Sequence, residues 1–422
     1  MRKIMDWLGR ALNLGNRLPS STAILTIVLL SLGVKLAYIT LLGGGLAAFP
    51  REGSDVYFYD GAARALLQNG VYGVDPSQPT TEMPPGQPVF LAALYGLSGY
   101  SIAFAKLGHI ALLTAVAVLT YLTGAKLFSP AVGFWGGVLI AIDPAQAYLA
   151  GTFLSEPLFI FLIVLGLYSL LLGTKKPASR WWLVGAGVCF GLAGLTRNQG
   201  WAFPVALMGG AAITFGRLIP VRVAALVLAV TAITIAPWTY RNYRLTGQII
   251  PVSSEGGLTF WASNNPEFVY RPPMPMSLPV YAAPPGLSQT ELNRYYWDRT
   301  WVWIASHPVD FVVNDLRKLV ALYHFDPLSW RPEVSLLFRL AGLFPYGLML
   351  PFIVLAAIEQ IRNPRLWLIF AYILYSTLLA MLFYGDSRIR APIQPYLYLF
   401  GAAWLVDFSA RLLKPVSLKG EA

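Results

Sequence analysis

Long apolar runs alternate with short polar segments along almost the whole chain. A helix needs roughly 20 apolar residues to cross the hydrocarbon core of a bilayer, and many of these runs approach that length. Prolines, glycines and charged residues separate them. The runs cover residues 21–45, 101–124, 130–149, 157–173, 181–196, 201–216, 222–238, 338–358, 366–384 and 393–410. The pattern predicts an all-α polytopic membrane protein with about ten transmembrane helices.

Two longer polar segments interrupt this pattern, and the first covers residues 50–100. Asp55 opens a run, Val56 to Asn69, whose apolar residues recur at helical spacing and whose first turn is aromatic. A break at Pro84-Pro85-Gly86 precedes a second short apolar run that ends at Gly99. Amphipathic runs of this kind suit a membrane surface better than a crossing. We therefore expect two interfacial helices here, with Asp55 as the N-cap of the first.

The second long polar segment covers residues 239–335 and is rich in Pro, Trp, Tyr and Asn. Ser288, followed by Glu291 three residues later, forms a capping-box pattern that predicts a helix from Ser288 to Ala305. Residues 311–325 predict a short interfacial or re-entrant helix, because a full crossing would upset the alternation of the spans. Long irregular loops are usually functional.

The composition agrees with a membrane protein. Hydrophobic residues make up 56% of the 422 residues and charged residues 12%, whereas ordinary soluble domains carry about 25% charged residues. A net charge of +11 is typical of proteins that bind nucleic acid, but most of the positive charge here lies in short segments between apolar runs. Such a distribution orients a membrane protein, so no nucleic-acid partner is expected. The single cysteine, Cys189, excludes a disulfide within the chain and a cysteine metal site.

The basic residues also predict the orientation of the chain. They place both termini in the cytoplasm and the segments 50–100 and 239–335 on the outer side. The first apolar run is long and lacks a convincing cleavage site, so we expect it to be a span rather than a removed signal. The predicted location is the inner, or plasma, membrane of the cell, with a functional site on its outer, periplasmic side.

Charged residues of both signs gather at this outer side. Carboxylates and guanidiniums that converge at one membrane face suit an anionic amphiphile, because an acid can accept a proton and arginines can hold a phosphate bidentately. The residues that this topology brings to the outer side are Asp55, Glu82, Glu156, Arg197, Arg241, Arg244, Arg388 and Arg390.

Several of these residues also have a purely structural account. Arg244 and Arg390 lie at span ends, where arginines commonly anchor to lipid headgroups. Glu156 precedes Pro157 and could simply begin a helix. Lys35 lies inside the first run, where it either extends toward the interface or faces the site.

Six sequence blocks allow a comparison with known families. The first segment contains SDVYFYDGAARALLQNGVYG (54–73) and TEMPPGQPVFLAALYGLSG (81–99). The others are SEPLFIF (155–161), GLTRNQG (194–200), PWTYRNYRLTGQIIPVSSEGGLTFWASNNP (237–266) and FYGDSRIRAPIQP (383–395). In this order they resemble the GT-C glycosyltransferases, specifically the protein O-mannosyltransferase and aminoarabinose transferase group often labelled family 39. The order of the blocks, and its agreement with the topology, make the resemblance more specific than any one block.

The resemblance implies a single GT-C transmembrane domain over residues 1–422. In this fold the two juxtamembrane helices of the first outer loop, residues 50–100, cover a cavity between the spans. The implied donor is a sugar on a polyprenyl phosphate. The acceptor is a lipid, a glycan or a protein, and membrane lipids are the other partners. Neither the sugar nor the acceptor follows from the sequence.

The resemblance also implies roles for individual residues. Asp55 matches the catalytic base, and Glu156 matches the acid of the elbow after the third span. Glu82 matches a position near metal or phosphate, while Arg388 and Arg390 match basic residues near the carrier phosphate. Many relatives have a second acid directly after the first-loop Asp, but here that position is Val56. This departure leaves a divalent metal cofactor open, with Asp55 and Glu82 as its candidate ligands.

These observations lead to one mechanistic hypothesis. Asp55 deprotonates an acceptor hydroxyl, which attacks the anomeric carbon with inversion, and Arg388, with Arg197 or Arg241, meets the charge of the leaving polyprenyl phosphate. The alternative is a transporter or flippase of a lipid-linked or small anionic substrate, which would more naturally show repeats and ionisable residues in the middle of spans. An inactive relative that binds lipid or supports an assembly is a third reading.

Overall fold

A computed structural model gives the arrangement of most of the chain. It describes residues 9–50, 54–75, 77–174, 179–200, 203–204, 221–268, 279–325, 336, 340 and 343–413. Within these residues the structure is built from helices and connecting segments and contains no strand. The predicted all-α fold class is confirmed.

Several of the described helices are long and apolar enough to cross a membrane. They are α2 (Ser20–Leu41), α5 (Ile102–Leu127), α8 (Glu156–Gly173), α11 (Val221–Thr246) and the segment Leu343–Gln360, which joins a π-helical turn, η4 (Leu343–Gly347), to α16 (Leu348–Gln360). Shorter helices include α6 (Pro130–Ile142), α9 (Arg180–Thr196) and α17 (Trp367–Leu382), and α19 (Gln394–Leu413) is the last described helix. The predicted run 201–216 lies outside the described residues except for Phe203 and Pro204.

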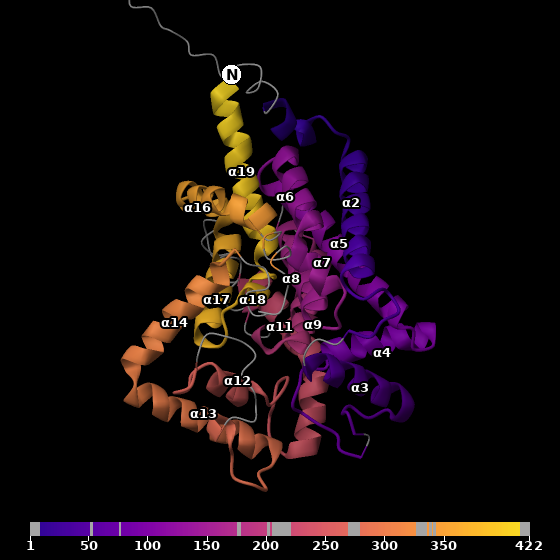
Figure 1. Ribbon diagram of the computed structural model, residues 1–422, viewed down its shortest axis with the longest axis vertical. Coiled ribbons are helices and arrows are strands. Elements are labelled where there is room, and N and C mark those ends of the chain that lie inside the picture. The colour runs from indigo at the N-terminus through magenta and orange to yellow at the C-terminus, as the bar shows by residue number, and fades with distance from the viewer. Residues whose placement is uncertain are drawn as a thin grey trace, which may run out of the picture.

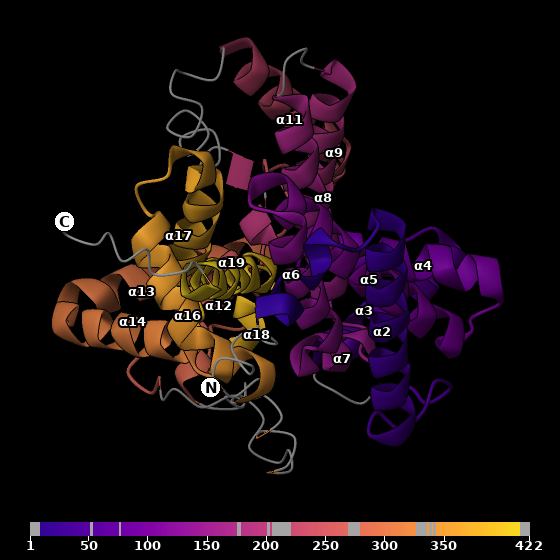
Figure 2. The same cartoon turned by 90° about the horizontal axis from the view of Figure 1, so that it is seen from above.

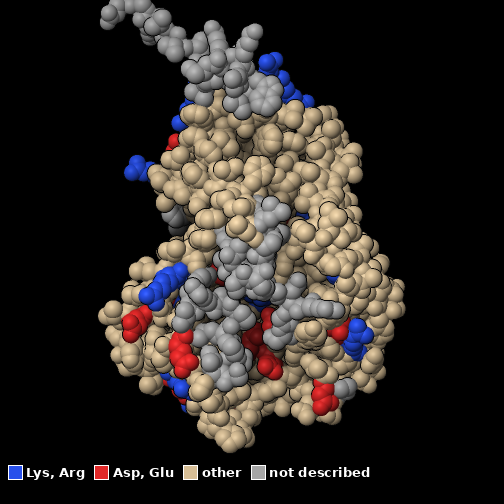
Figure 3. Space-filling view, in the orientation of Figure 1, with Lys and Arg blue, Asp and Glu red and all other residues tan. Residues whose placement is uncertain are grey.

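The helices pack into one bundle. Figure 2 shows α2 to α7 on one side and α13, α14, α16 and α17 on the other. Close approach of α5 and α6 depends on glycine: a Cβ on Gly133 would lie 2.6 Å from the backbone nitrogen of Ala125. On the face seen in Figure 3, charged side chains gather toward the two ends of the molecule, and the band between them is mostly uncharged. Such a band suits the hydrocarbon core of a bilayer.

One predicted span is broken in the structure. The run 130–149 forms two helices, α6 and α7 (Pro144–Ala150), which meet at Asp143. Pro144 cannot donate a backbone hydrogen bond to the preceding turn, and the Asp143 carboxylate accepts from Ala145 N at 2.8 Å and Gln146 N at 3.2 Å. The prediction of one continuous helix was therefore wrong. Conversely, α11 continues through Pro237 to Thr246, beyond the predicted run 222–238.

The first polar segment forms the two helices expected of it. They are α3 (Ser54–Asn69) and α4 (Gly86–Ser98). The prediction of Asp55 as N-cap was wrong, because α3 begins at Ser54 and Asp55 lies within its first turn. Asp60 on α3 accepts hydrogen bonds from Tyr95 on α4 at 2.6 Å and from Arg64 at 2.8 Å, which ties the two helices together. Figure 1 shows α3, α4, α12 and α13 at the end of the molecule opposite the N-terminus and the last turns of α19.

The second polar segment contributes α12 (Gly256–Ala262), η3 (Pro279–Tyr281), α13 (Gln289–Ser306) and α14 (Pro308–Tyr323). The predicted capping box is confirmed, because Ser288 and Glu291 hydrogen-bond in both directions at the start of α13. Trp261, Tyr296 and Trp303 form part of a small separate core between α12 and α13. Val309, Val312, Val313, Leu316 and Val320 form an exposed apolar stripe on α14, beside the exposed charged residues Asp310 and Arg317.

Candidate active site

Glu156 lies at the centre of a cluster of charges. It is the first residue of α8, and only 1% of its side chain is exposed. One carboxylate oxygen, Oε1, accepts a hydrogen bond from Arg197 Nη1 at 2.7 Å and another from Arg388 Nε. The same Arg197 nitrogen donates to Ser155 Oγ at 3.0 Å. Two guanidiniums from distant segments thus converge on one buried carboxylate.

Arg388 connects this cluster to the first polar segment. Its Nη2 lies 3.5 Å from Asp55 Oδ2, so one guanidinium contacts both Asp55 and Glu156. The Asp55 side chain is 33% exposed and the Arg388 side chain 19% exposed. Burial disfavours the charge of Arg388, but Glu156 and Asp55 more than offset this, so the pKa of Arg388 lies above its ordinary value. Of the two acids that contact Arg388, Asp55 has the more exposed side chain.

The segment before Arg388 is held by a buried cap. Arg388 belongs to the short helix α18 (Ser387–Arg390), and Asp386 Oδ1 accepts from Ile389 N at 2.9 Å. Burial raises the pKa of Asp386, while the Ile389 amide and Arg388 oppose that shift. The cap fixes the direction in which α18 leaves α17, and with it the position of Arg388.

Glu255 is a member of the site region that no sequence motif singled out. It directly precedes α12, and Asn198 Nδ2 lies 3.4 Å from its Oε1. Burial, and then the negative charges of Asp55 and Glu82, raise its pKa to about 8, although Arg197 opposes the shift. It is the one acid within the block 237–266, which is the signal that could have drawn attention to it.

The structure does not bring every predicted residue into the cluster. Glu82 is exposed, and its charge acts on Glu255 without an ion pair to the arginines among the described contacts. Arg241 donates to the carbonyl oxygens of Thr80 at 2.6 Å and Tyr72 at 3.3 Å, which ties α11 to the first loop. Arg390 is buried and donates to Leu322 O at 3.0 Å and to His324 O. The sequence-based expectation that Arg241 and Arg390 hold a phosphate has no support from these contacts.

Asp55 and Glu82 are the metal ligands that the sequence left open. Among the side chains that the structure places, no three from His, Cys, Asp and Glu are grouped so that they could hold a metal ion. Asp55 and Glu82 therefore lack a third ligand of these types within the described residues.

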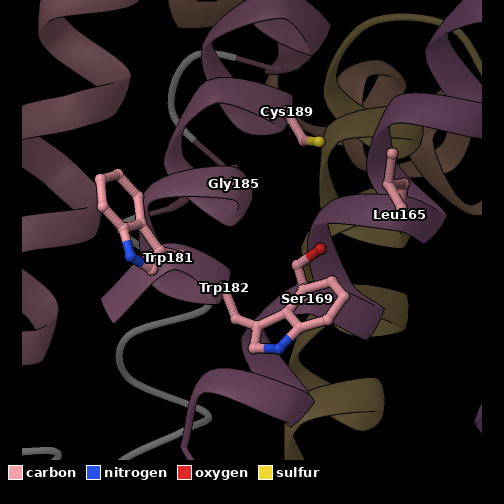
Figure 4. A pocket seen from close by; sticks show the side chains of 6 residues that line it. All are labelled: Leu165, Ser169, Trp181, Trp182, Gly185 and Cys189. Carbon is pink, nitrogen blue, oxygen red and sulfur yellow. The ribbon is translucent and has the colours of Figure 1, made fainter. Parts of the chain in front are cut away.

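Two hollows lie in the transmembrane bundle. The first is a narrow gap of about 10 Å³ at Ile389, the residue after Arg388, and the residues that line it are Phe159, Gln199, Phe203, Tyr372, Tyr375, Ser376, Leu379, Ile389 and Pro392. The second lies between α8 and α9, toward the other end of α8 from Glu156, and is lined by Leu165, Ser169, Trp181, Trp182, Gly185 and Cys189 (Figure 4). Only the first adjoins the charged cluster, and its walls are largely aromatic and aliphatic.

Comparisons with known proteins agree with this architecture. Residues 82–240 match the family model described as dolichyl-phosphate-mannose-protein mannosyltransferase. No curated protein sequence matches the chain. Among solved structures, ArnT from Cupriavidus metallidurans in the apo state matches with a TM-score of 0.60 and 14% identity, covering 91% of this chain and 59% of that one.

Archaeal oligosaccharyltransferases also match. The Archaeoglobus fulgidus enzyme in the apo form gives a TM-score of 0.58 at 13% identity, covering 93% of this chain and 51% of that one. The enzyme AglB from the same organism, in complex with an inhibitory peptide and a dolichol-phosphate, gives 0.55 at 14% identity, covering 92% and 50%. The chain thus spans roughly half to three-fifths of the length of these proteins. The resemblance to the GT-C glycosyltransferases is confirmed, and the chain has their fold.

Proposed function

We propose that the chain is an integral membrane glycosyltransferase that moves a sugar from a polyprenyl-phosphate donor to an acceptor at the outer face of the membrane. The observation that carries the proposal is the contact between Asp55 and Arg388, whose Oδ2 and Nη2 lie 3.5 Å apart. A partly exposed carboxylate beside a fixed guanidinium places a proton acceptor next to a phosphate-binding group. Displacement of a phosphate from a sugar by a hydroxyl requires both.

The proposed reaction is a single displacement with inversion. The Asp55 carboxylate accepts the proton of the acceptor hydroxyl as its oxygen forms a bond to the anomeric carbon. The bond between that carbon and the phosphate oxygen breaks, and the polyprenyl phosphate leaves with the electron pair. Arg388 donates hydrogen bonds to the phosphate, whose negative charge grows as the bond breaks. General-base assistance of this kind contributes about 10²- to 10⁴-fold to the rate.

In this scheme Glu156 holds the arginines in place. Its Oε1 accepts from both Arg197 and Arg388, so its charge is directed toward them rather than toward a substrate proton. Its other oxygen, Oε2, is buried and has no hydrogen-bond partner among the described residues. A hydroxyl of the donor sugar is the natural group to satisfy this oxygen. Arg197 then shares the binding of the phosphate with Arg388.

The surroundings of Arg388 suit a lipid-linked phosphate. Ile389, Phe159 of α8 and Leu379 of α17 line a narrow apolar gap of about 10 Å³, which would have to widen to admit the first isoprene units of the carrier. The family model that matches residues 82–240 is named for a dolichyl-phosphate sugar, and one of the matched structures holds a dolichol-phosphate. A cation beside apolar side chains favours a ligand with an anionic head and a hydrocarbon chain.

The decisive test uses the purified protein in lipid nanodiscs with polyprenyl phosphates that carry radiolabelled sugars. Transfer of label to an acceptor, or slow hydrolysis with release of free carrier, is the expected result. Asp55→Asn should lower that turnover by about 10²-fold or more while the protein still binds the carrier. The exposed Asp75 of the same loop supplies the matched control, since Asp75→Asn should keep wild-type turnover.

Three outcomes would overturn the proposal. Wild-type turnover in Asp55→Asn would remove the base from its role. Movement of the intact donor across the membrane of a proteoliposome, without cleavage of the sugar–phosphate bond, would indicate a transporter. Binding with neither cleavage nor movement would indicate a lipid-binding protein.

A further inference from the structure

The segment that carries Arg388 lies directly against α14. A Cβ on Gly385 would lie 2.8 Å from both the carbonyl carbon and the Cβ of Lys318, which is closer than real side chains come. The backbone at Gly385 therefore rests on α14 in a way that only glycine permits. Three residues later the chain reaches Arg388.

Lys318 itself is buried and forms bridging contacts. Its side chain is 0% exposed, and its Nζ donates to Asn264 Oδ1 at 2.9 Å and to Asp315 Oδ1 at 3.0 Å. Asn264 lies just after α12 and donates from Nδ2 to Leu382 O, the last residue of α17, at 2.8 Å. These hydrogen bonds connect α14, the end of α12 and the end of α17. The segment that carries Arg388 begins directly after the end of α17.

The other side of Arg388 is fastened to the same helix. Arg390 donates to Leu322 O at 3.0 Å and to His324 O, which are carbonyls at the C-terminal end of α14. Its guanidinium lies 3.7 Å from the centre of the Tyr346 ring, next to α16. Arg388 is thus presented from a short segment attached to α14 at Gly385 and again at Arg390. Burying an ammonium or a guanidinium is costly unless its hydrogen bonds are made, so loss of either set of contacts would be unfavourable.

We propose that Lys318, Asn264 and Gly385 are positioning residues, which hold Arg388 in the orientation where it contacts Asp55 and Glu156 and binds the donor phosphate. None of them touches the reacting atoms. The proposal rests on the phosphate-binding role of Arg388 given above. It assigns part of the second polar segment, through α12 and α14, to donor recognition.

The test measures binding of undecaprenyl phosphate without a sugar, together with donor and acceptor KM values. Lys318→Met keeps the length of the side chain but removes its hydrogen bonds, and Gly385→Ala displaces the backbone. Each should weaken binding of undecaprenyl phosphate about tenfold and raise donor KM by a similar factor, with acceptor KM unchanged. Gly33→Ala is the matched control, because a Cβ on Gly33 meets nothing within 4 Å.

A double-mutant cycle separates positioning from general destabilisation. Arg388→Ala alone should weaken binding by about 30-fold or more, and adding Lys318→Met or Gly385→Ala should weaken it no further. Additive losses, or equal increases in donor and acceptor KM, would show that the two residues act only on stability and would overturn the inference. If Gly385→Ala does not fold, the cycle with Lys318→Met carries the test.

The cycle also distinguishes failure of this inference from failure of the proposed function. Unchanged binding in Arg388→Ala would refute the phosphate-binding role itself. Weakened binding in Arg388→Ala, with wild-type binding in Lys318→Met and Gly385→Ala, would refute the positioning role alone.

Discussion

Arg388 makes the contacts on which the site depends. One guanidinium reaches Asp55 on α3 and Glu156 on α8, and the segment around it is fastened to α14. Arginine suits this place better than lysine, because a planar fork of donors can serve two acceptors and a phosphate together, whereas an ammonium is a point charge. Asp55 and Arg388 lie near opposite ends of the chain, and the fold brings their side chains together.

Glu255 provides a prediction at this scale. Its pKa is raised from the ordinary value of 4.5 to about 8, so the folded protein holds a proton there that the unfolded chain releases. A raised pKa of an acid means that stability is highest below the unfolded pKa and declines as pH rises from about 4.5 to about 8. Glu255→Gln should remove this part of the decline and raise the melting temperature at pH 8. Thermal unfolding in detergent between pH 5 and 8 measures it, and an unchanged slope in the variant would contradict it.

Residues of the site were predictable from sequence to different degrees. Asp55, Glu156 and Arg388 were expected from charge, topology and the family resemblance, and Arg197 from charge and topology. Glu255 was not, because a lone acid in a loop gains importance only from the side chains that surround it. Arg241 and Arg390 were expected to bind the donor, yet most of their hydrogen bonds go to backbone carbonyls, and the others go to the side-chain oxygens of Asn242 and Gln394. Sequence position places an arginine near a membrane face but does not show which acceptor it finds.

At the scale of the helices, small residues decide how closely the spans approach. Gly133 on α6 lies against Tyr121 and Ala125 of α5, where a Cβ would overlap backbone atoms. Gly133→Ala should destabilise the protein by about 1–3 kcal/mol, because the overlap can be relieved only by separating the helices. Denaturant or thermal unfolding measures the loss. Gly33→Ala, on the open face of α2, should stay within about 0.5 kcal/mol of wild type, and similar losses in both variants would refute the explanation.

The helices themselves were largely predictable, because apolar runs of span length are a strong signal. The break in the run 130–149 was not expected. Asp143 combines the cap of α7 with an accepted hydrogen bond from Tyr398 on α19, and the latter partner is invisible in the local sequence. The surroundings of Lys35 were likewise not predictable from the local sequence. It is fully buried and donates to Ser31 Oγ at 2.7 Å, so it neither extends to the interface nor joins the charged cluster.

For the whole molecule, the distribution of basic residues predicts which end faces outward. The end with α3, α4 and α13 should lie outside, opposite the N-terminus (Figure 1). In a Cys189→Ser background, Asp75→Cys and Arg294→Cys should react with a membrane-impermeant maleimide on intact cells. Arg362→Cys should react only after the membrane is opened. The reverse labelling pattern would invert the topology and place the site on the inner face.

Helix α14 connects an exposed apolar surface to the charged cluster. Its exposed side carries the apolar stripe Val309, Val312, Val313, Leu316 and Val320 beside Asp310 and Arg317, and other residues of the helix contact Gly385 and Arg390. A helix with such a side settles at the boundary between lipid tails and water. Because α14 also holds the segment that carries Arg388, a change in bilayer thickness or lipid packing at that boundary should shift the position of Arg388. The affinity for the donor should therefore change with the thickness of the surrounding bilayer. Binding measurements in nanodiscs of different acyl-chain length would reveal that dependence.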